Sequence, residues 1–502
     1  MVIIMMNTIS TSGKRFIDEF GRERIFNGIN VCDKGVYEPE QDTRTYGHEW
    51  EKELITTFYN SGFNLIRLGF NWDIIEPQPG EYNGEYIEFL RGILDRCEKA
   101  GIYVYLDMHQ DLYSGFGNGN GDGAPKWATL TDKYTYKRAK FVWAEGYFWG
   151  RAVHRAFDNF WDNKQVRGKG LQDYYADMWK YVVNQLGEHP AVIGYDLMNE
   201  PFPGKSGGKV FRILIRGLVT TTLFDKTISK KELLSCVFNK EKSLQIANQY
   251  TAKHLRKVTS KADAIMKKFD IERYSPFIDK TSAAVREEDK DGVIFIENSY
   301  YSNLGIPCHA REVTVDGKRD ESFAYAPHAY DLVADTLSYK YAGTERIESI
   351  MKEQKRMQER LLVPVVFGEW GGFQPDSEWY YHCHHIQSLF DKWHWSNTYW
   401  AYFDGLFDSP IMTEVLCRPY PRAVSGEIVD YRHDRQADTF ELTYRQSREF
   451  EAPTEIFAHK PVKSVEVDGE YEIKPLDGCD GSVVIIKTGT GTHSVKIKFC
   501  NE

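Results

Sequence analysis

Two glutamates that end apolar runs are the residues in this sequence best suited to do chemistry. Glu200 follows the run that begins at Tyr195 and precedes Pro201, and Glu369 ends Val363-Pro-Val-Val-Phe-Gly-Glu369. Pro201 stops the first run, and glycines beside Glu369 let a ligand approach closely. A carboxylic acid that donates a proton and a carboxylate that attacks carbon are together what glycoside cleavage requires. Either glutamate alone is equally well interpreted as a structural ion-pair residue, but the two together favour catalysis.

The elements that must position these glutamates form the pattern of an α/β barrel. Short β-branched or aromatic runs alternate with amphipathic stretches, which is typical of a parallel sheet wrapped by helices. In such a barrel the carboxyl ends of the strands face the active-site mouth, so both glutamates would meet there. The candidate strands are Ile25–Val31, Phe63–Phe70, Tyr103–His109, Val192–Glu200, Val293–Asn298, Phe323–His328, Val363–Glu369 and Thr398–Asp404.

Apolar residues at helical spacing predict the helices that cover this barrel. They are Trp50, Leu54 and Phe58; Tyr86, Leu90, Ile93, Leu94 and Cys97; and Tyr175, Met178, Trp179, Val182 and Leu186. After about residue 420 strict alternation replaces that spacing, as in Phe440/Leu442/Tyr444. We therefore predict a (β/α)8 TIM barrel over residues 1–418, with an insertion at about 203–291, and a C-terminal antiparallel β-sandwich domain over residues 419–502.

Composition narrows the class of partner. The net charge of −10 argues against nucleic acid, because phosphate binding needs concentrated Lys and Arg. The eight cysteines include no CxxC pair, so the thiols are expected to be reduced. The apolar run Val2–Met6 has no basic residue before it and no cleavage site behind it, and no stretch approaches the roughly 20 apolar residues of a membrane span. These features predict a cytoplasmic protein, or a secreted one if a leader has been removed.

Two motifs resemble binding sites but have simpler interpretations. Gly115–Gly123 is rich in glycine, yet no helix start with a phosphate-binding Lys-Ser/Thr follows it. His382-Cys-His-His385 does not have a known metal-ligand spacing and is expected to lie on a helix face. We therefore predict no metal and no organic cofactor.

Several longer motifs resemble a known family. Asn199-Glu200-Pro201 and Phe367-Gly368-Glu369 are similar to the fourth- and seventh-strand signatures of glycoside hydrolase family 5. Within that family, the chain most resembles the endoglycoceramidases. The motifs that carry this resemblance are Leu106–Gly115, Asn118–Ala128, Arg155–Trp161, Tyr195–Phe202, Arg418–Gly426 and Ala452–Ile456.

The resemblance implies roles for ten residues. Glu369 would be the nucleophile and Glu200 the acid/base of a retaining β-glycosidase, and Arg67 would keep the nucleophile ionised. Asn199 would bind the substrate 2-hydroxyl, and His328 and Tyr330 would position the nucleophile and the ring oxygen. The remaining sugar contacts implied are His109, Asp111, Trp400 as the stacking floor, and Lys34, for which a solvated lysine is an equally good interpretation.

The substrate implied by the resemblance is a glycosphingolipid cut between glycan and ceramide. One alternative is an intracellular exo-acting β-glucosidase on glucosylceramide or another glucoside, and another is a glycolipid-binding protein without turnover. The apolar stretch Val210–Val219, with Arg212 and Arg216 at helical spacing, is consistent with transient contact with a membrane surface or micelle. A helix that covers the barrel rim explains it equally well. The oligomeric state is left open.

Overall fold

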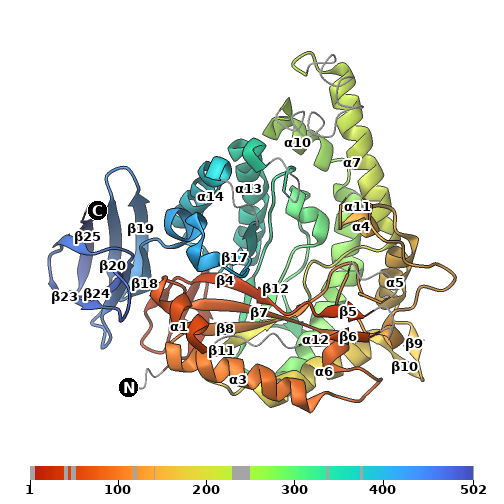
Figure 1. Cartoon of the computed structure of the whole chain (residues 1–502), viewed down its shortest axis with the longest axis horizontal. Helices are drawn as coiled ribbons and strands as arrows, with labels where there is room; N and C mark the ends of the chain where they lie inside the picture. The colour runs from red at the N-terminus through yellow and green to blue at the C-terminus, as the bar shows by residue number, and fades with distance from the viewer. Residues whose placement is uncertain are drawn as a thin grey trace.

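Eight parallel strands form a barrel in the centre of the molecule (Figure 1). The computed structural model describes residues 6–38, 43–46, 52–116, 121–140, 142–228, 249–334, 339–372 and 377–500. The sheet order is β15-β12-β11-β8-β7-β4-β17-β16, and the pairings of Tyr325 with Val365 and of His328 with Glu369 close it. The strands are β4 Asn27–Cys32, β7 Leu65–Asn71, β8 Tyr103–His109, β11 Val192–Asp196, β12 Val293–Ile296, β15 Phe323–Tyr325, β16 Val366–Gly371 and β17 Ser396–Trp400. The predicted TIM barrel is confirmed.

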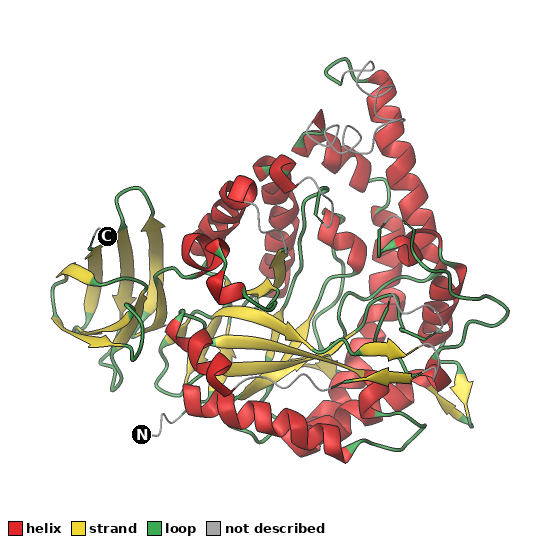
Figure 2. Ribbon diagram, viewed as in Figure 1, coloured by secondary structure: helices red, strands yellow, loops and turns green. Residues whose placement is uncertain are grey.

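Helices surround the strands on the outside (Figure 2). They are α1 Lys52–Asn60, α2 Trp72–Ile75, α3 Gly84–Ala100, α6 Leu171–Leu186, α12 Ser275–Glu288, α13 Thr344–Leu361 and α14 Tyr380–Trp393. Local chemistry sets their ends: the Asn83 side chain accepts from the Tyr86 amide where α3 begins, and Gly101 at φ 75° ends it. The apolar stripes predicted for α3 and α6 are buried. Trp50 and the Leu54 side chain lie outside the described residues.

The longest departure from the barrel follows β11. It includes α7 Lys205–Phe224, α10 Ala252–Thr259 and α11 Asp263–Phe269. Two helices that precede β11, α4 Glu145–Trp149 and α5 Arg151–Trp161, pack against α7, as α10 does. Figure 1 shows α7 extending away from the barrel at the top of the view. Among the described residues, none of the helices combines the length and the apolarity that crossing a bilayer demands.

Two antiparallel sheets form the C-terminal β-sandwich, as predicted. One has the order β1-β2-β3-β18-β21-β24-β23 and the other β19-β20-β25-β22. An apolar core that includes Phe440, Leu442 and Tyr444 lies between them. The strands are β1 Ile9–Ser12, β2 Arg15–Asp18, β3 Glu23–Arg24, β18 Tyr420–Val424, β19 Glu427–Asp434, β20 Thr439–Gln446, β21 Thr454–Ala458, β22 Val462–Glu466, β23 Glu470–Pro475, β24 Ser482–Lys487 and β25 Gly491–Phe499.

The N-terminal strands connect the sandwich to the barrel. β3 pairs with β18 through Arg24 and Ala423, so one sheet contains both ends of the chain. Ile9 and Phe16, from β1 and β2, pack with inward-facing barrel residues such as Phe295. This apolar layer fills the barrel at the end opposite the carboxyl ends of the strands. The polar site described below therefore lies at one end of the interior only.

Candidate active site

Strand alternation carries functional side chains into the barrel interior. Side chains on one face of a strand recur every second residue, so Tyr105, Asp107 and His109 of β8 point the same way. Tyr105 packs in the apolar layer, whereas Asp107 Oδ2 lies 2.8 Å from His109 Nδ1. In β7 the same alternation brings Arg67 inside, where its side chain is fully buried. The interior thus changes from apolar to charged toward the carboxyl ends of the strands.

Arg67 organises a cluster of four buried carboxylates. Its Nη1 donates to Glu369 Oε1 at 2.9 Å, and its Nε donates to Asp196 Oδ2 at 2.9 Å. Its Nη2 lies 2.9 Å from Asp107 Oδ1 and donates to Glu297 Oε1 at 2.6 Å. One guanidinium cannot neutralise four carboxylates, so bound protons or other cations must offset the remaining negative charge.

The two predicted glutamates face the same nitrogen of one imidazole. His328 Nδ1 is 3.1 Å from Glu200 Oε1 and 3.5 Å from Glu369 Oε2. One ligand atom from each of the three side chains lies within 4.8 Å of the others. In retaining glycosidases the two carboxyl groups are about 5–5.5 Å apart, whereas inverting enzymes need about 6.5–9.5 Å to admit a water molecule. The observed spacing is that of a retaining pair.

Glu200 does not belong to the strand that precedes it. The sequence predicted a strand through Glu200, but β11 ends at Asp196 and Glu200 has φ 41°. A positive φ is unfavourable for a residue with a Cβ, so the surroundings must hold this conformation. The Glu200 amide donates to Glu297 Oε2 at 2.7 Å, and the side-chain amide of Gln110 donates to the Glu200 carbonyl at 3.2 Å. These bonds fix the direction of the Glu200 carboxyl group.

The electrostatic environment keeps a proton on Glu200 near neutral pH. Burial raises the pKa of Glu200 to about 7; the hydrogen bond from His328 acts against this increase, and the charge of Glu369 adds to it. Burial opposes the charged form of His328, but Glu297 and Glu369 raise its pKa well above the ordinary value. His328 is thus an imidazolium that offsets part of the carboxylate charge.

A second group of polar side chains surrounds the ring of Trp400. The rings of Trp400 and His109 stack with centroids 5.3 Å apart at 10°. Lys34 Nζ lies 4.7 Å from the Trp400 ring centre and pairs with Asp111. Burial raises the pKa of Asp111, yet Lys34 and His109 outweigh it and hold the pKa at about 2. This end of the pocket offers an aromatic face together with donors and acceptors, the combination that sugars require.

These residues line a cavity of about 630 Å³. Eight of the ten predicted residues line it: Lys34, His109, Asp111, Asn199, Glu200, Tyr330, Glu369 and Trp400. Arg67 and His328 are fully buried and do not line it. The lining also includes apolar side chains: Val142, Trp143, Ala144, Phe148, Leu304, Leu332 and Ala334.

Hydrogen bonds to protein groups hold two of the lining residues in place. The Tyr330 hydroxyl donates to Glu369 Oε2 at 2.9 Å. Asn199 Oδ1 accepts from Arg67 at 3.0 Å and its Nδ2 donates to the Gln110 carbonyl at 3.0 Å. These bonds orient the Asn199 amide at the rim of the pocket. Whether these side chains perform the implied roles stays a prediction.

The sequence interpretation missed three residues that the structure brings to this site. Glu297 bonds the Glu200 amide and lies 3.4 Å from His328 Nε2. The Asn303 side-chain amide donates to Glu200 Oε1, and Asp122 lies 3.8 Å from Lys34 Nζ. Glu297 ends an apolar run as Glu200 does, so the sequence contained the pattern that would have identified it. Asn303 is in a short 3-10 helix and Asp122 is in a loop, and neither follows an apolar run.

Comparison with known families agrees with this geometry. The family described as cellulase (glycosyl hydrolase family 5) matches residues 18–404, which is more than half of the chain. The chain belongs to glycoside hydrolase family 5. The glycoside hydrolase family 5 C-terminal domain matches residues 418–498, which include the strands β18 to β24.

Relatives within family 5 include endoglycoceramidases. The protein of that name from Hydra vulgaris is 34% identical over 218 residues, which are 39% of this chain and 41% of the relative. Endoglycoceramidase I of Rhodococcus hoagii is 25% identical over 511 residues, covering 98% of this chain and 88% of the relative. The chain spans about two fifths of the length of the Hydra vulgaris and Cyanea nozakii relatives that it matches. The resemblance noted from the motifs is confirmed.

Solved structures share the fold over almost the whole chain. Endo-glycoceramidase II from Rhodococcus sp. superposes with a TM-score of 0.73 at 22% identity, covering 98% of this chain and 100% of that one. A sterylglucosidase from Cryptococcus neoformans superposes with a TM-score of 0.70 at 15% identity, covering 99% and 97%. At these identities the likeness establishes the fold.

Proposed function

We propose that this chain is a retaining β-glycosidase that cleaves the bond between the glycan and the ceramide of glycosphingolipids. The observation that carries the proposal is the mixed lining of the pocket. Besides Glu200 and Glu369, the lining includes Lys34 and Trp400, which can contact a sugar, and apolar side chains such as Phe148 and Leu332. A sugar fits the polar groups and a lipid chain fits the apolar ones. Relatives named endoglycoceramidase support the same substrate.

In the first step, Glu369 attacks the anomeric carbon while the bond from that carbon to the ceramide oxygen breaks. Arg67 and Tyr330 each donate to one Glu369 oxygen, so the carboxylate is oriented before substrate arrives. Glu200, protonated near neutral pH, gives its proton to the departing oxygen. The products are ceramide and a glycosyl ester of Glu369.

In the second step, water hydrolyses the glycosyl ester of Glu369. Once Glu369 is esterified its negative charge is lost, so the pKa of Glu200 falls and its carboxylate can take a proton from water. The hydroxide equivalent attacks the same anomeric carbon, releasing the glycan and restoring both carboxyl groups. Asn199 at the pocket rim would donate to the sugar 2-hydroxyl, and Trp400 would stack on the ring.

The exposed surface of α7 supports contact with a lipid surface. Ile215, Val219 and Leu223 recur every fourth residue and are exposed, and Phe224 is 80% exposed. Arg212 and Arg216 are exposed on the same helix. An apolar stripe beside basic residues favours insertion into the boundary of an anionic bilayer or micelle. Such contact would bring membrane lipids to a pocket whose wall includes residues of the neighbouring segment Val142–Phe148.

A second candidate is an exo-acting β-glucosidase that removes glucose from glucosylceramide or another glucoside. Relatives named glucosylceramidase match 40% of this chain at 26% identity. Lys34 and Asp111 pair directly beside Trp400.

Product analysis by mass spectrometry distinguishes these candidates. The chain is incubated separately with a ganglioside and with glucosylceramide, using Glu369→Gln as the blank. Intact oligosaccharide and ceramide from the ganglioside are the expected result. Glucose from glucosylceramide with an unchanged ganglioside would establish the exo-acting candidate instead. No product from either, with a folded protein, would contradict both ceramide substrates and leave another glucoside as the substrate to test.

A further inference from the structure

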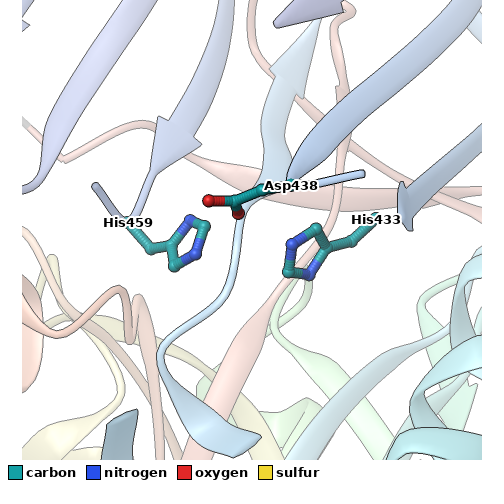
Figure 3. Close-up of side chains that lie close together, drawn as sticks. All are labelled: His433, Asp438 and His459. Carbon is teal, nitrogen blue, oxygen red and sulfur yellow. The ribbon is translucent and has the colours of Figure 1, made fainter. Parts of the chain in front are cut away.

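Three side chains able to bind a metal meet in the C-terminal sandwich, away from the glycosidase pocket. His433 is at the end of β19, Asp438 precedes β20, and His459 follows β21. Figure 3 shows the two imidazole rings on either side of the Asp438 carboxylate. One ligand atom from each residue lies within 4.8 Å of the others. The three residues come from two separate chain segments that the sandwich brings together.

The imidazoles of this cluster lack the hydrogen bonds that buried rings normally make. Among the described residues, neither ring nitrogen of His433 has a hydrogen-bond partner, and Nδ1 of His459 also has none. These three nitrogen atoms are nevertheless shielded from solvent. Buried polar atoms are satisfied in most native proteins, so a group of unpartnered ones indicates a missing ligand or ion.

The basic neighbours of the cluster already have partners: Arg418 is held by Asp391 at 2.6 Å, and Arg435 donates to Gln387 at 2.7 Å.

The other acid and histidine clusters of the described residues differ from this one. Arg67 pairs with Asp107, Asp196 and Glu297, and Lys34 pairs with Asp111 and Asp122, so one cation is shared by several carboxylates of each cluster. In the proposed site, Lys460 pairs with Asp438 alone among the described residues. His328 lies between Glu200 and Glu369 and is protonated. The cluster Asp95, Glu98 and His189 is more exposed and has one imidazole.

We propose that His433, Asp438 and His459 bind one divalent transition-metal ion of the zinc class. Two imidazole nitrogens and one carboxylate oxygen are ligands that Zn²⁺ and Co²⁺ accept, whereas Ca²⁺ needs six or more oxygens. Tetrahedral ligands at about 2.1 Å from zinc are about 3.4 Å apart, so small side-chain rotations close the site. Water completes the coordination.

The ion would connect the turn between β19 and β20 to the segment after β21. Because β19 also packs against the barrel helix α14, the bound metal would stabilise the contact between the sandwich and the barrel. Lys460 Nζ lies 3.4 Å from Asp438 Oδ2 and is the cation that the metal must displace. Lys460→Met should therefore strengthen metal binding.

Metal titration of the chelator-treated full chain tests this site. Calorimetry with Zn²⁺, and visible absorption with Co²⁺, should each show one bound equivalent and a higher melting temperature. His433→Gln and His459→Gln should each weaken binding on the order of 10²-fold or more, since each removes a ligand where even the supporting shell is worth 10–100-fold. The matched control is His189→Gln, which should bind as the wild type does.

Three results would overturn the proposal: no bound equivalent in the wild type, unchanged affinity in both ligand variants, or loss of binding in the His189 control. Circular dichroism establishes that the variants are folded. A crystal of the metal-soaked wild type provides a measurement without substitutions, because anomalous scattering locates the ion. An ion elsewhere, with none between His433 and His459, would also contradict the site. Glycosidase activity is not a readout here, so the two proposals fail independently.

Discussion

Nη1 of Arg67 donates to Oε1 of Glu369 across 2.9 Å, and both side chains are buried. The same guanidinium contacts Asp107, Asp196 and Glu297. The bond that orients the proposed nucleophile is thus part of the network that makes the charged end of the barrel stable. Arg67 therefore contributes both to the stability of the fold and to the orientation of the proposed nucleophile.

Replacing Arg67 with Met should lower the free energy of unfolding. The substitution leaves buried carboxylates without their cation, which costs about 3–5 kcal/mol in the free energy of unfolding. The cost should be smaller at pH 4 than at pH 8, because protonated carboxyls need no counter-charge. Denaturant unfolding measures it. Arg432→Met removes an exposed pair with Glu441 and should change stability by less than about 1 kcal/mol; equal effects would contradict the interpretation.

Changing Glu369 or Glu200 to glutamine should lower kcat in ways that depend differently on the leaving group. Glu369→Gln removes the nucleophile and should lower kcat on the order of 10⁴-fold for every substrate. Glu200→Gln should be equally damaging for a lipid leaving group but much less so for a nitrophenyl glycoside, whose departure needs no proton. Added azide should restore turnover in the Glu200 variant alone. The same loss with both substrates in the Glu200 variant would exclude its role as the acid.

The alkaline limb of the pH profile should report the proton on Glu200. The first step needs the protonated acid, so kcat/KM should fall about tenfold per pH unit as pH rises above the pKa of about 7. Stopped assays from pH 4 to pH 9 measure this limb. A limb that begins near the ordinary glutamate pKa would show that burial does not raise the value.

The hydrogen bond from Asn303 should lower the pKa of Glu200. Its amide donates to Glu200 Oε1, and a donor stabilises the ionised form. Asn303→Ala should therefore move the alkaline limb to higher pH by about one unit, the equivalent of one hydrogen bond to a charged group. Asn184→Ala, which loses an exposed bond to Glu288, should leave the limb in place. A lower kcat without a shifted limb would indicate only a packing role for Asn303.

The apolar stripe on α7 should govern binding to vesicles. Val219→Ser combined with Leu223→Ser should weaken co-sedimentation with anionic phospholipid vesicles, because it removes apolar area from the membrane boundary. Turnover of a soluble nitrophenyl glycoside should stay at the wild-type value. An exposed control is Tyr471→Ser, on β23 of the sandwich. Vesicle binding that is unchanged in the α7 variant, or lost in the control, would contradict the proposed contact.

Local sequence was sufficient to predict the elements and the two central carboxylates. Each of the eight predicted runs overlaps a barrel strand, because strand formation depends on neighbouring β-branched and aromatic residues. Strand ends were less accurate: the run predicted to end at Asp404 ends at Trp400. Glu200 and Glu369 were found because each follows an apolar run directly, a signal contained within a few residues.

Only the tertiary structure decided which distant groups act on those glutamates. Asn303 reaches Glu200 across 103 positions in sequence, and Arg67 reaches Glu369 across 302. Such distances follow from the closure and strand order of the barrel, which no local pattern encodes. The pairing of β3 with β18 likewise joins the two ends of the chain. The sequence by itself determined the fold class and identified the two candidate carboxylates; their spacing, their environment and the lining of the pocket arise from contacts made only when the barrel closes.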